Sequence, residues 1–351
     1  MATTAPAAPR KAITHDVYDS WKSIQGVKLA DDGGWLAYTL QPQDGGGELV
    51  VKNLATGAER TQPRGRDAQF TADGRYVVFT VAPVKAEVDK AKKAKKKPED
   101  QPKAGLGVLE LASGTAWTTE RVKSVRLAKD ASRFIAYLRE PAEKRPGDKK
   151  DEEKPAAEAP KPDAPKKKEK KKDPGTDLVI RELATGAEVV VAEVTDYRWS
   201  DDGAWLAYTV SSKTPVNDGA FARRMEDGVV TALATGQGHY KQLAWDEASR
   251  QVAFVSDRDD YQADAPVFAL YHWSAGAPGA RVLVGATAAG LRDGHAVSEH
   301  GALQFSKDGE RLFLGTAPRP VPERGEDAPE PVKVDLWRWK DPLPHPMQNA
   351  R

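Results

Sequence analysis

One short unit recurs along the chain and constrains the fold more than any other feature of the sequence. It reads as an apolar or aromatic residue, a small polar residue, any residue, Asp, Gly, two further residues and a short apolar strand. An internal repeat of this kind indicates stacked copies of one supersecondary unit. Six copies are present, the third and fifth degenerate at the Asp-Gly pair: residues 29–39, 70–80, 127–137, 199–209, 245–255 and 305–315.

The residue types of this unit predict a β-hairpin. Asp-Gly supplies a tight turn, because Gly accepts a positive φ and Asp tolerates one. In the strand after the first turn, Trp35, Ala37 and Thr39 point to one side and Leu36 and Tyr38 point to the other. Both sides are apolar, which suits a sheet that packs between two neighbouring sheets, as a propeller blade does.

A second recurring unit supplies a third strand, a turn at Gly and the start of a fourth strand. The distance from Gly33 to Gly74 is 41 residues, and from Gly203 to Ala248, where the turn Gly is replaced, it is 45. Blades of WD-type propellers run about 40–45 residues. Copies of the second unit are found at residues 48–57, 107–114, 177–186, 229–236, 268–276 and 334–339.

Together the two units predict an all-β fold, a β-propeller of four-stranded blades. About six blades are present, which indicates an incomplete seven- or eight-bladed ring. No long amphipathic segment with a 3.6-residue period competes with this interpretation. We expect an N-terminal arm at residues 1–24 and the propeller at residues 25–351, with Trp21 in a short helix or arm near the entry.

Two Lys-rich insertions, at residues 82–104 and 139–176, interrupt the repeat. The first has 8 Lys and Arg against 4 Asp and Glu, and the second has 13 against 10, so the net charge of +1 for the whole chain comes from them. Such segments cannot bury apolar area, so we expect disordered loops. A polybasic arm for nucleic acid or anionic lipid is the alternative. The interleaved acids and the lack of aromatic residues argue against it, and we predict no nucleic-acid partner.

The sequence offers no recognisable catalytic machinery. The G-x-S-x-G nucleophile elbow of α/β-hydrolases is absent. The nearest match, AVSEH at residues 296–300, lacks the first Gly and is expected in a loop between propeller strands. Ser298 and His300 are therefore interpreted as loop residues, and no catalytic residue is predicted.

Candidate metal ligands are scattered along the chain. Neither H-E-x-x-H nor any Cys is present, so no zinc site is predicted. Asp257, Asp259 and Asp260 form an oxygen-rich run, but without EF-hand spacing they are interpreted as a solvated turn. The six histidines are interpreted as isolated surface, edge or structural residues: His15, His239, His272, His295, His300 and His345.

Anion-binding motifs are equally weak. Gly45, Gly46, Gly47 and Gly294 are not followed by Gly-Lys-Ser/Thr, so they form no phosphate loop. The pair at residues 223–224, Arg-Arg, could clamp a carboxylate, although a charged pair on an exposed loop is more typical of solubility. No cofactor and no cofactor-binding residue are predicted.

Composition sets the remaining limits. The chain contains no Cys, which excludes disulfides and thiolate chemistry. Residues 1–16 lack the apolar segment of a signal peptide, and no run approaches 18 apolar residues, so no membrane span is expected. These observations leave the compartment open.

The first repeat unit resembles the TolB-like propeller repeat, which also builds the N-terminal domain of prolyl oligopeptidase family serine peptidases. Three segments resemble large bacterial members of that family more specifically. They are THDVYDSWKSI at residues 14–24, the Lys-rich insertion ahead of GLGVL at residues 105–109, and DLWRWKDP at residues 335–342. The resemblance covers residues 11–349.

The resemblance implies a propeller of seven or eight blades joined to a C-terminal α/β-hydrolase domain that holds a Ser-Asp-His triad. In the family the propeller sits over that site and filters substrates by size. No position of this sequence matches the triad motifs, so no triad residue is carried over. Members of this type usually carry an export signal, which implies a periplasmic or secreted location, although residues 1–16 contain no such signal.

Three hypotheses about function are compatible with the sequence. The first is the non-catalytic propeller of a prolyl oligopeptidase-like peptidase, which gates access to a hydrolase domain absent from this chain. The second is a stand-alone TolB-like propeller that binds a protein partner. The third, an enzyme with its site in the central channel, needs a cluster of His or carboxylates that the sequence does not display. An incomplete ring leaves an open sheet edge, so self-association is also expected.

Overall fold

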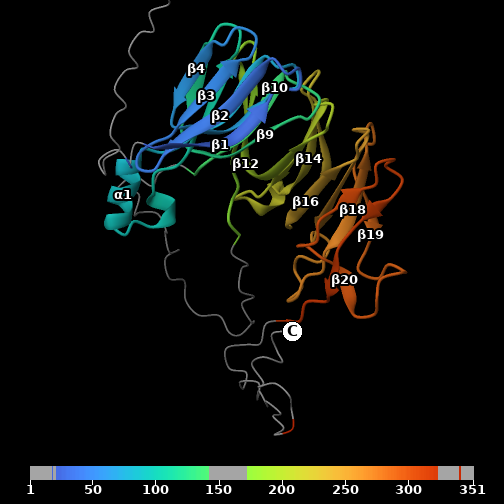
Figure 1. Cartoon of the computed structure of the whole chain (residues 1–351). Helices are drawn as coiled ribbons and strands as arrows, with labels where there is room; N and C mark the ends of the chain where they lie inside the picture. Colours follow the sequence, from blue (N-terminus) through green and yellow to red (C-terminus); the bar gives the residue numbers. More distant parts are fainter. Residues whose placement is uncertain (1–17, 19–20, 142–171, 323–339, 341–351) are drawn as a thin grey trace, which may run out of the picture.

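The computed structural model describes residue 18, residues 21–141 and 172–322, and residue 340. Antiparallel sheets follow one another along an open arc, with β1 (Lys22–Leu29) at one end and β20 (His295–Val297) at the other (Figure 1). This arrangement confirms the predicted propeller of four-stranded blades. Within the described residues the arc does not close into a ring.

Blades 1 and 2 are separate four-stranded sheets in which each strand pairs with the next along the chain. The two repeated sequence units therefore supply the two hairpins of a blade. Blade 1 consists of β1, β2 (Trp35–Pro42), β3 (Glu48–Asn53) and β4 (Glu59–Pro63), and blade 2 of β5 (Gly65–Phe70), β6 (Tyr76–Val81), β7 (Gly105–Glu110) and β8 (Ala116–Thr119).

Blades 3 and 4 share one long strand, β12 (Glu188–Trp199), and so form a seven-stranded sheet. The first part of β12 pairs with β11 as the outer strand of blade 3, and its second part pairs with β13 as the inner strand of blade 4. The other strands are β9 (Val122–Leu127), β10 (Phe134–Arg139), β11 (Thr176–Glu182), β13 (Trp205–Val210), β14 (Gly219–Arg224) and β15 (Val230–Thr235).

Blade 5 is complete, and one hairpin of a sixth blade follows it. In that hairpin a Cβ on Gly301 would lie 2.6 Å from the Cα of Gly315, so the two backbones approach closely where the strands are interrupted. The final strand predicted at residues 334–339 lies outside the described residues. Blade 5 contains β16 (Tyr240–Trp245), β17 (Gln251–Ser256), β18 (Ala269–Ser274) and β19 (Arg281–Val284), and the hairpin contains β20, β21 (Gln304–Phe305), β22 (Leu312–Phe313) and β23 (Thr316–Pro318).

The repeated Ser/Thr-x-Asp-Gly segment folds as one hydrogen-bonded turn. In blade 4 the Ser200 hydroxyl donates to Asp202 Oδ1 at 2.7 Å and accepts the backbone N–H of Trp205 at 2.9 Å. Gly203 follows with a φ of +67°, which a residue without a Cβ adopts freely. Thr71 with Asp73, and Ser306 with Asp308, repeat this arrangement. The polar residues of the repeat are therefore turn formers.

Two degenerate copies of the turn differ in instructive ways. In blade 5 the positive φ falls on Ser249, at +58°, and not on Ala248, so Ser249 stands where the regular turns have Gly. In blade 3, Leu127 pairs with Ile135, whereas Leu29 of blade 1 pairs with Leu36. One extra residue lies in the blade 3 turn, which explains its loss of the Asp-Gly sequence.

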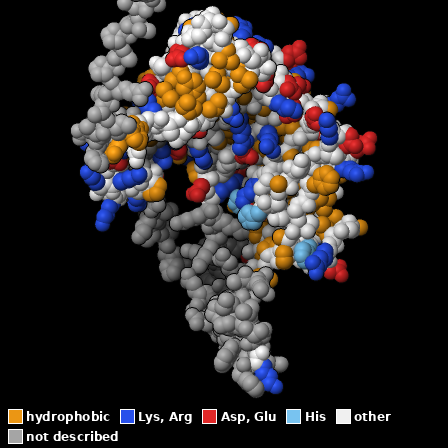
Figure 2. Space-filling model, in the orientation of Figure 1, with side chains coloured by type: hydrophobic (Ala, Val, Ile, Leu, Met, Phe, Trp, Pro, Cys, Tyr) orange, Lys and Arg blue, Asp and Glu red, His pale blue; other side chains and the backbone are white. Residues whose placement is uncertain are grey.

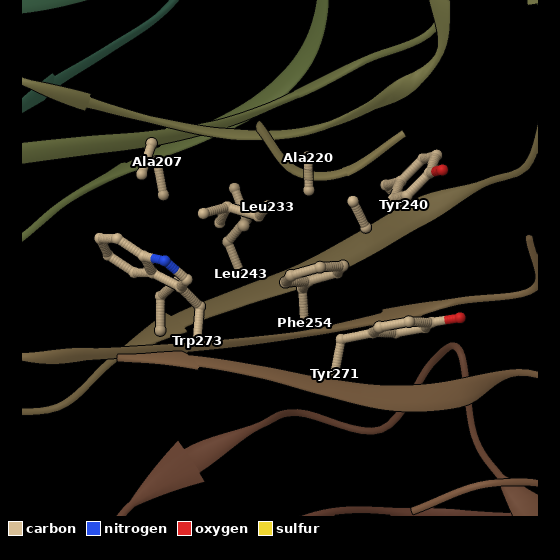
Figure 3. Packing of buried hydrophobic residues seen from close by; sticks show 11 residues of the cluster. Ala207, Ala220, Leu233, Tyr240, Leu243, Phe254, Tyr271 and Trp273 are labelled. Atoms are coloured by element: carbon tan, nitrogen blue, oxygen red, sulfur yellow. The ribbon is translucent and has the colours of Figure 1, made fainter. Parts of the chain in front are cut away.

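Buried apolar side chains fill the junctions between neighbouring blades, and at the junction of blades 4 and 5 large side chains pack against alanines. On the second strand of blade 5, Val252 and Phe254 face blade 4, where they meet Ala207, Ala220 and Ala222 (Figure 3). The ring of Phe254 stacks on that of Tyr271, with centroids 5.2 Å apart. Burial of these side chains drives the stacking of blades. The equivalent large pairs at the other junctions are also buried: Val77 and Phe79, Ile135 and Tyr137, and Leu206 and Tyr208.

Polar atoms of large aromatic residues tie the inner strands together. Trp199 and Trp245 end the first strands of blades 4 and 5, and their Nε1 atoms donate to the carbonyls of Arg126 and Arg198 in the preceding blades, at 2.9 and 3.1 Å. Tyr197 donates to the carbonyl of Ala136 at 3.1 Å, and burial raises the pKa of its hydroxyl to about 12. The tryptophans in the described repeats thus serve the blade junctions.

Two strand assignments made from sequence are wrong. The sequence predicts a third strand at residues 229–236, but this segment contains β15, the fourth strand of blade 4. The third strand is β14, whose Gly-Ala-Phe-Ala-Arg-Arg sequence lacks the β-branched residues found in the third strands of blades 1–3. At the N-terminus, residues 22–24 belong to β1 of the first blade and not to a separate arm.

The first insertion is more ordered than its composition indicated. Residues 82–104, expected as a disordered loop, contain α1 (Lys85–Lys93) and a 3₁₀ turn (Pro98–Asp100). Ala91 is buried and Lys85 pairs with Asp44 of blade 1, so tertiary contacts hold a helix that the charge run disguised. Most of the second insertion, residues 142–171, lies outside the described residues.

The two ends of the strands form two unlike surfaces. The turn face carries the connections from first to second and from third to fourth strands, which are short. The loop face carries the connections from second to third strands and the crossovers between blades. The second-to-third connections span residues 43–47, 82–104, 140–175, 211–218 and 257–268.

The outer side of blade 1 lacks a neighbouring blade among the described residues. Leu36 and Tyr38 are partly exposed, although their equivalents in blades 2–5 are buried. Ile24, Val27 and Leu29 of β1 are all more than half exposed. A hydrophobic patch over this end of the arc is visible in Figure 2.

Candidate functional site on the loop face

A cavity of about 740 Å³ opens where the inner strands of blades 3, 4 and 5 meet the loop face. Lys, Arg and His side chains gather along this inner side of the arc (Figure 2). The lining includes four Lys and Arg side chains and three carboxylates: Arg126, Lys172, Arg198, Lys241, Asp173, Asp196 and Glu299. The cavity is therefore polar and of mixed charge.

Two buried carboxylates lie behind this cavity and hold cationic or polar groups at its edge. Asp218 is fully buried, and its Oδ2 lies 2.6 Å from Lys172 Nζ. Its Oδ1 accepts the backbone N–H of Ser212 at 2.7 Å, so the carboxylate is well supplied with donors. Lys172 also donates to the carbonyl of Gly238. A buried ion pair of this kind is costly to desolvate, which makes it a candidate for a functional role.

The second buried carboxylate orients a histidine. Asp257 is 1% exposed; its Oδ1 accepts the backbone N–H of His239 at 2.6 Å, and its Oδ2 lies 2.8 Å from His239 Nδ1. Both bonds fix the imidazole relative to its own backbone. His239 borders the main cavity and a neighbouring one of about 450 Å³. With Nδ1 held by Asp257, Nε2 is the nitrogen left for a ligand.

Backbone irregularities shape the cavity wall. Glu193 and Gln242 have φ angles of +59° and +60°, and the strand pairing shifts at Val194/Asp196 and at Lys241/Ala244. Such bulges re-aim side chains at the ends of strands. The Glu193 carboxylate accepts hydrogen bonds from Ser212 Oγ and from the backbone N–H of Lys213, which lower its pKa.

The exposed cations of the wall differ in how they are paired. Arg126 pairs with Asp196, and Lys241 pairs with Glu299. Arg198 has no carboxylate partner among the described residues; its Nη1 donates to the carbonyl of Leu243 at 3.2 Å. Its remaining guanidinium donors are available to a bound group.

The residues first considered for catalysis do not form a triad. Ser298 Oγ accepts the backbone N–H of His300 at 3.2 Å, and the His300 ring lies near Glu299, at 3.7 Å, with 85% of its side chain exposed. His295 Nδ1 lies 3.0 Å from the carbonyl of Asp293. Ser298 and His300 therefore lie on a loop, as the sequence indicated, without a nucleophile–base contact.

The acidic run after β17 is divided among separate partners. Asp257 holds His239, Asp259 accepts the Tyr271 hydroxyl at 2.5 Å, and Asp260 accepts the backbone N–H of Val267 at 2.8 Å. Across the described residues, no group of three or more His, Asp or Glu side chains is placed to hold a metal ion.

The Arg-Arg pair lies on strand β14 and not on a loop. The carboxylate that Arg224 binds is Asp227 of the adjacent turn, with both oxygens accepting from Nε at 3.0 and 3.1 Å. These contacts and the backbone N–H of Val229 lower the pKa of Asp227 to about 2. The pair is therefore a turn clamp on the opposite surface from the cavity.

The remaining candidates are structural or lie elsewhere. His272 is buried on β18 with Nε2 2.8 Å from Gln251 Oε1, and desolvation, followed by the charge of Arg281, lowers its pKa. Gly45, Gly46 and Gly47 lie in the β2–β3 connection, and Gly294 directly precedes β20. His15 and His345 lie outside the described residues. In the described part of the chain, no helix is long and apolar enough to cross a membrane.

Sequence reasoning did not bring the cavity residues together. Lys172 closes a Lys-rich run that reads as solvent-exposed, and Asp218 lies in a polar segment directly before β14. Asp257 was predicted to lie in a solvated turn, but its side chain is buried. Their common position, in second-to-third connections of successive blades, was the signal that could have joined them.

Comparison with known proteins yields fold similarities. No protein-family model matches the sequence, and no curated protein matches it. Among solved structures, a prolyl endopeptidase aligns with 84% of this chain at 15% identity and a TM-score of 0.42, and the chain spans 39% of that protein. TolB from Acinetobacter baumannii aligns with 72% of this chain and 52% of its own length, at 12% identity and a TM-score of 0.32.

The β-propeller domain of the trilobed protease from Pyrococcus furiosus, described as having an open velcro topology, aligns with 87% of this chain and 86% of its own length, at 12% identity and a TM-score of 0.39. The structural neighbours thus include the prolyl endopeptidase and TolB classes that the sequence resemblance named. At these values they say nothing about the activity of this chain.

Proposed function

We propose that this chain is the non-catalytic propeller of a prolyl oligopeptidase-like serine peptidase, and that it restricts the access of peptides to a hydrolase domain. One observation carries the proposal. The inner side of the arc, where a substrate would pass, holds a polar cavity at the surface with the long connections, while Ser298 and His300 form no triad there. Such a wall can contact a passing chain without cleaving it.

The coding sequence beyond the codon for Arg351 gives the first test. An in-frame continuation that encodes G-x-S-x-G, followed by an Asp and a His, would supply the hydrolase domain. The full-length protein is then expected to cleave short peptides while sparing long unfolded polypeptides. A full-length enzyme that cleaves both at equal rates would contradict gating.

A stop codon at that point would overturn the peptidase proposal. The chain would then be a TolB-like module, and its inner cavity would serve a protein partner. Capture of a defined partner that is lost on mutation of the cavity would support that second reading.

Self-association is a separate proposal about partners, with a second copy of this chain as the occupant of the open end. Leu36 and Tyr38 occupy positions that are buried against the preceding blade in blades 2–5. At the other end of the arc, Phe313 lies on the second strand of the last hairpin. The residues at the same position in earlier blades, such as Ala37 and Val78, are buried against the following blade, whereas the Phe313 side chain is 57% exposed. The two ends thus carry the two halves of a blade junction.

We propose that the last hairpin of one copy packs on blade 1 of another. Sedimentation velocity over a concentration series is expected to show association that Tyr38→Lys weakens, while Arg75→Gln on the turn face leaves it intact. A single monomeric species at every concentration would overturn the proposal.

A further inference from the structure

We infer that the loop-face cavity binds a carboxylate group of a peptide, and that Arg198 is its main anchor. The inference rests on the proposed function for the role of this face and adds the chemistry of the ligand. It is carried by the geometry around three side chains: Arg198, Lys172 and His239.

Arg198 has the donors that a carboxylate requires. The guanidinium is exposed on the inner strand of blade 4 and uses Nη1 for the carbonyl of Leu243 in blade 5. That bond spans two blades and limits the movement of the side chain. A planar guanidinium with free N–H groups favours bidentate binding of a carboxylate.

Lys172 and His239 lie beside this anchor and are held by buried acids. The Lys172 side chain is 13% exposed. Its ammonium charge is balanced by the buried Asp218 carboxylate, so the pair as a whole adds no net charge to the interior. His239 is fixed by Asp257 through its Nδ1. The two residues are joined through Gly238, whose carbonyl accepts from Lys172 and which directly precedes His239. A rigid polar edge of this kind reduces the entropy lost on binding.

Two of the three lining carboxylates are already paired with cations of the wall. Asp196 is bound by Arg126, and Glu299 is bound by Lys241, at 2.8 and 2.5 Å. The third, Asp173, is exposed, and its backbone carbonyl accepts a hydrogen bond from Ser211 Oγ at 2.8 Å. Arg198 therefore remains the Lys or Arg in the wall that lacks a carboxylate partner among the described residues. The carboxylate of an acidic peptide side chain would complete its coordination.

The test uses the full 351-residue chain and two rhodamine-labelled peptides with amidated C-termini, Ala-Glu-Ala-Glu and Ala-Gln-Ala-Gln. Fluorescence anisotropy is expected to show tighter binding of the Glu peptide. Arg198→Gln should lower its affinity about tenfold, the size expected for a charge-assisted hydrogen bond. Arg75→Gln, an exposed arginine on the turn face, should leave the affinity unchanged.

A second variant guards against general charge effects. Lys241→Gln removes a cation that is already paired with Glu299 and is expected to weaken binding less than Arg198→Gln. Equal affinity for the two peptides, or equal loss in Arg198→Gln and Arg75→Gln, would overturn the inference. Because the assay involves no hydrolysis, such a failure leaves the gating proposal standing, and failure of gating in the full-length enzyme leaves the binding result standing.

Discussion

The two faces of this propeller are built from the same strands but follow different rules. On the turn face, Thr71, Ser200 and Ser306 form the same hydrogen-bonded turn with an Asp two residues later. On the loop face, the corresponding connections range from the five residues 43–47 to the long insertion at residues 140–175, and no two are alike.

The connections vary in length and structure on the loop face but are uniform on the turn face. Turns on one face touch one another, as when the Asp73 backbone N–H donates to Ser132 Oγ at 2.8 Å, so uniform geometry is needed for blades to stack. The loop face has no such requirement, and it is there that buried carboxylates hold Lys172 and His239 at a cavity. Function is expected on the face that stacking leaves free.

The largest expected contrast between the two faces is in the free energy of unfolding lost when an ion pair is broken. Lys172→Met leaves Asp218 buried without its cation, and we expect a loss of about 3 kcal/mol in the free energy of unfolding. Lys129→Met breaks the exposed turn-face pair with Asp201 and should cost far less, because solvent screens exposed ion pairs. Urea denaturation of both variants measures the two losses in the free energy of unfolding, and equal losses would contradict the predicted difference between the faces.

Glycines of the turn face test the need for close packing. Gly203→Ala combines a positive φ with a Cβ that would lie 2.5 Å from the Cβ of Ala131, and we expect a loss of about 2 kcal/mol. At Gly276, φ is also positive but no atom lies within 4 Å, so Gly276→Ala should cost about 1 kcal/mol. Thermal unfolding of the two variants compares them. A larger loss at Gly276 would show that contact between turns is unimportant.

Shortening a loop-face insertion should have little effect. Replacing residues 85–100 by a six-residue Gly-Ser linker removes α1 and its contact with Asp44, but no part of a blade junction. The stability change is expected to stay within about 0.5 kcal/mol, because loop length affects closure entropy only weakly. A large drop in the urea midpoint would mean that α1 supports the fold.

The smallest expected effect is the pH dependence of a turn-face clamp. Hydrogen bonds from Arg224 and from the Val229 N–H lower the pKa of Asp227 from 3.8 to about 2. A carboxyl with a lowered folded pKa contributes stability above its unfolded pKa and loses it as pH falls through the folded value. The difference in melting temperature between the wild type and Asp227→Asn should therefore shrink between pH 4 and pH 2. A constant difference over that range would contradict the clamp.

The sequence alone determined the architecture, because each repeat unit specifies its own turn and its own two-sided strand. Asp-Gly at residues 32–33 and the alternation from Trp35 to Thr39 require only local chemistry and so could be recognised. Where local signals were weak, at β14 and at the turn around Ser249, the assignments were misplaced.

Only the tertiary structure decided the candidate site. Lys172, Asp218, His239 and Asp257 come from separate connections of three blades, and none carries a local motif. They meet because the stacking of blades places the ends of successive strands side by side. Burial then supplies what sequence cannot display: two carboxylates removed from water, whose cost is offset by the Lys172 ammonium and by the hydrogen bonds of His239.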